Sequence, residues 1–170
     1  DHAGGSTRKN KQGKLEPTFP NAAHYIQKEN LDWANNPTEK DRASYLKEDW
    51  QPLQAAGLLK IIDGEKEILP GIQVRKFYGH TKGIQLPLLD DDKTKLFFCG
   101  DVIPTSVHLG IPWVMAYDLF PLTTMEEKKK ILEQAAKENW ILVFEHCPHT
   151  GATRIKAVEK GFELAEQVSL

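Results

Sequence analysis

The sequence predicts a layered α/β or α+β domain, and three features support that prediction. Apolar stretches of strand-like composition, separated by Gly, Pro and Asp, occupy much of residues 58–99. A segment with helical periodicity follows and leads directly into the apolar run at residues 140–144. The last stretch, residues 155–167, has the composition of a helix. Strands, a helix, a strand and a final helix are typical of a layered fold, and we treat residues 1–170 as one domain.

The first third of the chain predicts less regular structure. Residues 1–21 combine basic side chains with Gly, Asn and Pro, which is typical of a loop with a solvated basic edge. Residues 23–27 predict a short strand, and residues 38–54 predict a helix that begins after Pro37. The apolar side chains of this helix recur at helical spacing and are expected in the core: Tyr45, Leu46, Trp50 and Leu53.

The middle of the chain predicts strands at residues 59–62, 72–77 and 95–99, with a hairpin partner at 86–89. Three aspartates at 90–92 then form the hairpin tip, because the spaced oxygens and terminal Glu of a calcium loop are lacking.

A helix is predicted after this hairpin. Thr124-x-x-Glu127 reads as a capping box that opens it. One apolar face is expected to pack on the sheet, formed by Ile131, Leu132, Ala135 and Ala136.

Composition excludes several classes of function. The chain has 170 residues, of which 40% are hydrophobic and 27% charged, so it can form a core. Its net charge of -2 provides no field that attracts nucleic acid or an anionic membrane. No apolar run approaches the roughly 20 residues of a membrane-spanning helix. Two cysteines far apart in sequence favour a reducing, cytoplasmic setting. The chain opens without Met, so we expect an upstream segment, which is where a signal peptide would lie.

Metal-ligating side chains follow several predicted strands. His80 lies between glycines after residues 72–77, Asp101 follows residues 95–99, and His146 follows residues 140–144. Asp1 and His2 open the chain. A single histidine after a strand is more often a hydrogen-bonded structural residue, and a single Gly-Asp is more often a turn. Together, imidazoles and carboxylates at strand ends are the ligands of a zinc site.

Four of these segments resemble the metallo-β-lactamase superfamily, in the family's order. Asp1-His2-Ala3-Gly4-Gly5 resembles the end of the H-x-H-x-D-H-A-G-G signature, and residues 79–83 resemble its G-H-T-x-G element. Phe98-Cys99-Gly100-Asp101 resembles the segment with the bridging aspartate, and Glu145-His146 the last histidine. The departure is at Ile84, where many members have a second histidine that is usually not a ligand.

The resemblance implies a four-layer αββα sandwich, of which this chain covers the carboxyl-terminal part and lacks the amino-terminal portion. It implies that Asp1, His2 and His146 bind one metal ion, that Asp101 bridges two, and that His80 joins two upstream histidines on the other. A complete site of this kind holds two zinc ions, with iron or manganese as alternatives. These ions activate a hydroxide for hydrolysis, and Asp1 and Asp101 are the expected catalytic carboxylates.

Residues 103–121 form a long loop beside the predicted metal edge. His108, Trp113 and Tyr117 are candidate substrate-binding residues on an apolar wall. The alternative is that Trp113 and Phe120 hold the loop on the core.

The resemblance to lactonase-like and glyoxalase-II-like members implies hydrolysis of an ester, lactone or thioester, with a small-molecule substrate and a homodimer as an open option. A phosphodiesterase, an iron-containing oxidoreductase relative and an inactive truncated fragment are the alternatives.

Overall fold

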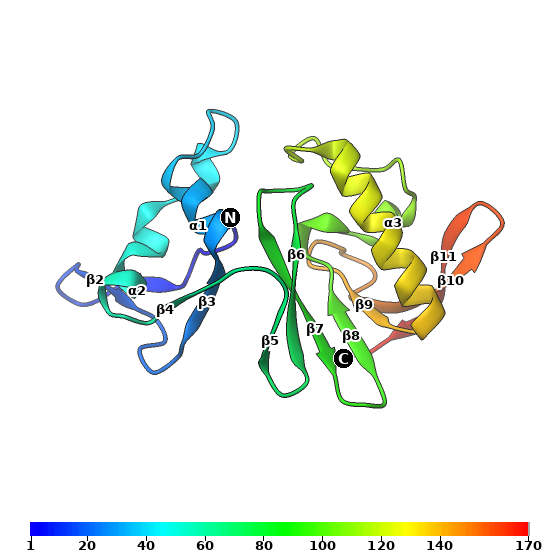
Figure 1. Cartoon of the computed structure of the whole chain (residues 1–170), viewed down its shortest axis with the longest axis horizontal. Coiled ribbons are helices and arrows are strands. Elements are labelled where there is room, and N and C mark those ends of the chain that lie inside the picture. Colours follow the sequence, from blue (N-terminus) through cyan, green and yellow to red (C-terminus); the bar gives the residue numbers. More distant parts are fainter. Residues whose placement is uncertain (170) are drawn as a thin grey trace. The chain divides into compact units, whose positions relative to one another are not determined.

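The computed structural model describes residues 1–169 and divides the chain into two compact units, Asp1–Gly64 and Glu65–Leu170 (Figure 1). The architecture is mixed α+β, as the sequence predicted, with most strands in one large sheet of the second unit.

The first unit contains two small sheets. In one, β1 (Thr7–Lys9) pairs antiparallel with β2 (Leu15–Pro17). In the other, β3 (His24–Gln27) pairs parallel with β4 (Leu59–Ile62), which confirms both predicted strands. The connection between β3 and β4 contains short helical elements: α1 (Lys28–Asn35), the 3-10 turns Arg42–Ser44 and Lys47–Asp49, and α2 (Gln51–Ala55).

Two predictions for this unit were wrong. Residues 1–21 contain the β1–β2 hairpin and are not simply a loop. Residues 38–54 do not form one helix, because the Asp41 carboxylate accepts hydrogen bonds from Thr38 N at 2.8 Å and Trp33 Nε1 at 2.6 Å. Such side-chain bonds to the local backbone compete with helical ones. The predicted core residues Tyr45, Trp50 and Leu53 are nevertheless buried, whereas Leu46 is exposed.

The second unit is built on a seven-stranded sheet in the order β11-β10-β9-β8-β7-β6-β5. Its first four strands are β5 (Lys66–Leu69), β6 (Ile72–Phe77), β7 (Ile84–Asp90) and β8 (Lys95–Phe98). The last three are β9 (Ile141–Val143), β10 (Ala152–Val158) and β11 (Gly161–Val168). All neighbours are antiparallel except β8 and β9, which are parallel. The pairing of β7 with β8 confirms the predicted hairpin.

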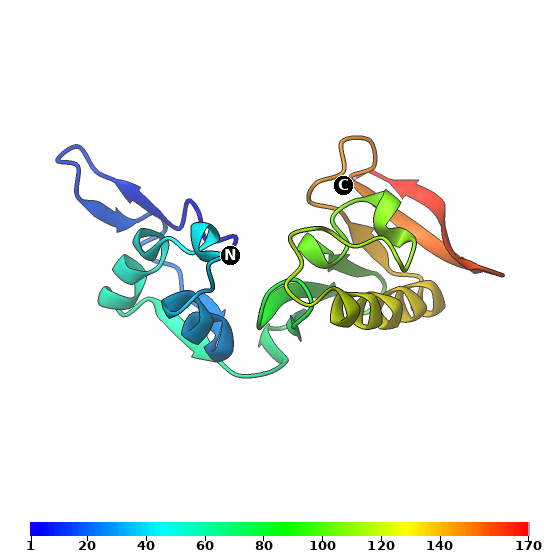
Figure 2. The same cartoon turned by 90° about the horizontal axis from the view of Figure 1, so that it is seen from above.

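Helix α3 (Pro121–Glu138) connects β8 to β9 and lies along one face of the sheet (Figures 1 and 2). Proline in its first turn and Asn139, which has a left-handed φ of 57°, set its two ends. The predicted capping box was wrong because the helix begins three residues earlier, which places Thr124 inside it. None of the described helices has the length and apolarity that crossing a membrane requires.

The core of the second unit lies between α3 and the sheet. Phe97, Leu132, Trp140 and Leu142 are fully buried there. The apolar helix face was predicted correctly, because Ile131, Leu132 and Ala135 are buried and Ala136 packs against them.

The carboxyl-terminal prediction was wrong, because residues 155–167 are strands of the β10–β11 hairpin. Their Lys, Ala, Glu and Leu favour a helix locally. In the fold, β10 instead covers the open edge of β9, and Gly161, with φ 113°, allows the tight turn. Ile155 is buried on the core, so tertiary context overrides helix propensity here.

Candidate metal centre

Three strand ends of the second unit meet at one edge of the sheet. Strands β8 and β9 are parallel, and β6 runs in the same direction as β8 because two antiparallel steps separate them. His80, Asp101 and His146 follow the carboxyl ends of these three strands. The topology therefore delivers two imidazoles and one carboxylate to the same edge.

The three side chains are in contact through Asp101. His80 Nε2 lies 3.2 Å from Asp101 Oδ2, and His146 Nε2 lies 3.1 Å from Asp101 Oδ1. The side chains of His80 and Asp101 are only 4% and 7% exposed, whereas that of His146 is 48% exposed. One carboxylate thus faces a buried imidazole with one oxygen and an accessible imidazole with the other.

His80 is held on its other side by Asp118, a residue to which the sequence analysis gave no role. His80 Nδ1 lies 2.9 Å from Asp118 Oδ1, and the Asp118 side chain is 1% exposed. Burial alone lowers the pKa of His80, but hydrogen bonds with Asp101 and Asp118 outweigh burial and raise this pKa to about 9. In the absence of a metal ion, the imidazole is accordingly protonated at neutral pH.

Glu127 fixes the backbone that presents His80. Its two carboxylate oxygens accept hydrogen bonds from Tyr78 N at 2.8 Å and Gly79 N at 2.9 Å. Glu127 therefore anchors the end of β6 to α3 rather than closing a capping box. Gly79 is required at this contact because a Cβ there would lie 2.4 Å from the backbone of Thr124.

Asp101 lies in a 3-10 turn, Gly100–Val102, directly after β8. Gly100 has φ 45°, and a Cβ at this position would lie 2.6 Å from Leu86 Cδ2. The left-handed φ favours glycine at this position, and a Cβ would also require the end of the Leu86 side chain to shift. His146 is held separately, because its backbone N–H donates to Pro104 O at 3.0 Å.

Glu145 is a further ligand candidate that the sequence analysis did not select. Asp101, Glu145 and His146 each place one potential ligand atom within 4.8 Å of the others. Glu145 and His146 are exposed, in contrast to Asp101. Asp1 and His2 precede β1 in the other unit, and their assignment as ligands stays a prediction.

The loop after Asp101 presents aromatic side chains to solvent. Trp113 is 61% exposed, Tyr117 78% and Phe120 42%. The alternative in which Trp113 and Phe120 hold the loop on the core is therefore wrong. His108 is half-buried, and its Nδ1 lies 2.8 Å from Thr105 Oγ1. The substrate contacts proposed for His108, Trp113 and Tyr117 stay predictions.

Lys128 and two apolar residues hold this loop instead. Ile103 and Leu109 are buried in the core. Lys128 extends from the buried face of α3 and is 0% exposed, and its Nζ donates to Gly110 O at 2.9 Å and to Trp113 O at 2.5 Å. Burial lowers the pKa of Lys128 to about 8, while the charge of Asp118 opposes that shift.

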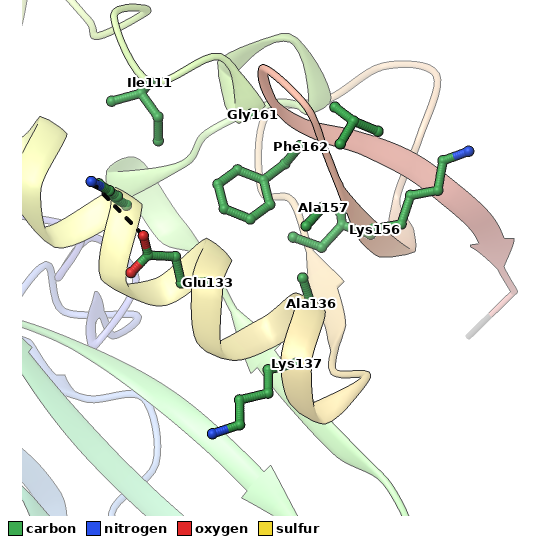
Figure 3. Close-up of a pocket in the computed structure, with 11 residues that line it drawn as sticks. Ile111, Glu133, Ala136, Lys137, Lys156, Ala157, Gly161 and Phe162 are labelled. Atoms are coloured by element: carbon green, nitrogen blue, oxygen red, sulfur yellow. Dashed lines mark ion pairs between the residues drawn. The ribbon is translucent and has the colours of Figure 1, made fainter.

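A cavity of about 560 Å³ in the second unit lies away from these residues, between α3 and the β10–β11 hairpin (Figure 3). Ile111, Ala157 and Phe162 contribute apolar surface to it. Lys137 and Lys156 point away from the space in Figure 3. Lys129 and Glu133 also line the cavity, but they form an ion pair with each other at 3.9 Å (Figure 3).

Several solved structures are similar to this chain in fold. The chain is similar to AidC, a dizinc quorum-quenching lactonase in complex with the product N-hexanoyl-L-homoserine. The TM-score is 0.79 and the sequence identity 25%, and the matched region covers 100% of this chain and 62% of AidC. It is similar to a probable metal-dependent hydrolase from Staphylococcus aureus, with a TM-score of 0.78 and 22% identity, covering 91% of this chain and 56% of that one.

A third similar structure is AbOPH, described as a hydrolase in the β-lactamase superfamily, with a TM-score of 0.76 and 22% identity, covering 91% of this chain and 57% of that one. The chain thus spans about three fifths of the length of these proteins. No protein-family model and no curated protein matched the chain. The chain thus has the metallo-β-lactamase fold, and its aspartate and histidine motifs occur in the order on which the sequence resemblance to that superfamily rests.

Proposed function

We propose that this chain forms the metal centre of a hydrolase that acts on an ester, lactone or thioester. One observation carries the proposal: the two oxygens of the buried Asp101 carboxylate each lie within 3.2 Å of a histidine Nε2. A carboxylate between two imidazoles at a sheet edge can bridge two divalent ions. Imidazole nitrogen and carboxylate oxygen are the ligands that zinc takes in catalytic sites.

The donor set fits a divalent metal ion. His80 and Asp101 are removed from water, so their charges need partners, while His146 keeps the edge accessible to a substrate. In the proposed arrangement Asp1, His2 and His146 would hold one zinc ion, His80 would hold the other, and Asp101 would be a ligand to both. Iron or manganese is the alternative metal for the same ligands.

Two bound ions would supply the polarisation of a substrate carbonyl and would lower the pKa of a water molecule. The residues of the chain do the rest. Asp101 would supply negative charge to both ions, and Asp1 would orient the attacking water or accept its proton. The aromatic side chains of Trp113 and Tyr117 form the apolar contact for the substrate, with His108 as a polar contact.

The substrate class rests on two observations. AidC is a lactonase, and AiiA of Bacillus thuringiensis, which is 24% identical with a TM-score of 0.62, has N-decanoyl-L-homoserine bound at its active site. The exposed Trp113 and Tyr117 suit an apolar acyl group of a small molecule. Homodimer formation and a cytoplasmic location stay predictions.

The test uses the full-length protein, as its own gene encodes it. Metal content is measured by mass spectrometry after purification, and hydrolysis is measured on panels of lactones, thioesters and phosphodiesters. We expect two divalent ions per chain and turnover of a carbonyl substrate that a chelator abolishes. Turnover of phosphodiesters alone would contradict the substrate class, and full turnover after complete metal removal would contradict the metal-dependent reaction.

A further inference from the structure

The His80 imidazole is hydrogen-bonded at both ring nitrogens. Nε2 lies 3.2 Å from Asp101 Oδ2 on one side, and Nδ1 lies 2.9 Å from Asp118 Oδ1 on the other. All three side chains are at most 7% exposed. Bulk water therefore does not compete for these bonds, and the ring has one defined orientation.

Asp118 is itself fixed by the loop that carries it. Its Oδ2 accepts a hydrogen bond from Met115 N at 3.3 Å. The next residue, Leu119, donates its N–H to His80 O at 3.0 Å. Phe120 N donates to Gly79 O at 2.9 Å, so this loop runs beside the segment that presents His80. The carboxylate and the imidazole are thus held by the same pair of backbone segments.

We propose that Asp118 is a positioning residue that keeps the proton of His80 on Nδ1 and so presents the Nε2 lone pair to a metal ion. The inference rests on the proposed function and extends it to a residue outside the ligand set. An ionised carboxylate only accepts hydrogen bonds, so Nδ1 must be the donor. The lone pair of the neutral ring then lies on Nε2, on the side of Asp101.

The hydrogen-bond partner of Nδ1 also affects how strongly His80 binds a metal ion. A carboxylate that accepts the N–H of a ligating histidine fixes its tautomer and raises its basicity, and loss of such a partner costs about 10- to 100-fold in metal affinity. Asp118→Asn keeps the side-chain shape but removes the charge. The amide can also turn its NH2 group toward Nδ1, which stabilises the wrong tautomer for binding through Nε2.

The experiment compares cobalt binding in the metal-stripped full-length wild type, Asp118→Asn and Asp92→Asn. Asp92 is exposed at the β7–β8 turn and its φ of 69° suits Asn, so this control makes the same chemical change away from the site. The visible absorption of cobalt reports binding. We expect one binding step of Asp118→Asn to weaken 10- to 100-fold, while the other step and the control keep wild-type affinities.

A measurement on the wild type alone covers the case in which Asp118→Asn fails to fold. Long-range proton–nitrogen NMR of the zinc-loaded protein should show His80 bound through Nε2 with a proton on Nδ1. Binding through Nδ1, or cobalt affinities of folded Asp118→Asn equal to wild type, would overturn the role of Asp118 alone. Failure of the wild type to bind cobalt would instead overturn the proposed function on which that role rests.

Discussion

Replacement of Lys128 by Met tests how the loop after Asp101 is held. Lys128 is fully buried and donates to the carbonyl oxygens of Gly110 and Trp113. Lys128→Met keeps an unbranched side chain of similar length and removes both the charge and the two hydrogen bonds. Two nearby groups interact with the ammonium: Asp118 raises the pKa of Lys128, and the pKa of His108 is lowered by burial and then by the charge of Lys128.

The pH dependence of this effect has a definite sign. Burial lowers the pKa of Lys128 from 10.5 to about 8 in the folded protein. Between these two values the unfolded chain binds more protons than the folded one, so the unfolding free energy of the wild type rises with pH. At 1.36 kcal/mol per pKa unit, the gain between pH 7 and pH 9.5 is about 2 kcal/mol. Lys128→Met lacks this contribution.

The assay is urea unfolding of both proteins in the presence of a chelator, at pH 7, 8 and 9.5. Titration of groups that do not interact with Lys128 affects both proteins alike and cancels in the difference. We expect the stability of the wild type relative to Lys128→Met to increase by about 2 kcal/mol across this range. A difference that is constant with pH, or that decreases, would refute the reasoning that a desolvated ammonium anchors the loop.

Three further substitutions probe the site and its loop. Asp101→Ala should lose metal and activity together, because it removes a ligand from both proposed ions. Metal analysis and turnover measurements on the same preparation check this. Full metal occupancy with unchanged turnover would show that Asp101 is only a turn residue. Gly79→Ala should lower the melting temperature and weaken metal binding, because its Cβ would lie 2.4 Å from the Thr124 backbone; wild-type values of both would contradict the packing. Trp113→Ala should raise KM about tenfold or more for a long-chain acyl substrate, because the lost apolar contact is worth about 1.5 kcal/mol or more. Leu122 is also exposed and apolar, and Leu122→Ala should leave KM unchanged. Equal effects of the two substitutions on KM would argue against substrate contact at Trp113.

The sequence predicted the meeting of His80, Asp101 and His146 because each follows a strand. Their convergence requires only that these strands run in the same direction, and the sheet order satisfies that condition. The roles of Asp118 and Glu127 could not be predicted in this way. Asp118 contacts a residue 38 positions away, and the pairing depends on how the loop packs.

Errors in the fold prediction have a related cause. Residues 155–167 have helix-favouring composition, yet in the fold they belong to the β10–β11 hairpin, whose two strands pair with each other and which joins β9 through Ala152 and Thr153. In residues 38–54 the deciding contact is local, because the Asp41 carboxylate bonds to Thr38 and Trp33. The apolar periodicity predicted most of the buried side chains in this segment, but it did not predict the conformation of the backbone.

Zinc anomalous diffraction from zinc-loaded crystals of the full-length protein would show whether Asp101 is a ligand to two metal ions. We expect an anomalous peak on each side of the Asp101 carboxylate, with the Nε2 atoms of His80 and His146 about 2.0 to 2.1 Å from their respective ions. Absence of any peak within ligand distance of Asp101, under conditions where zinc occupies other sites, would contradict it.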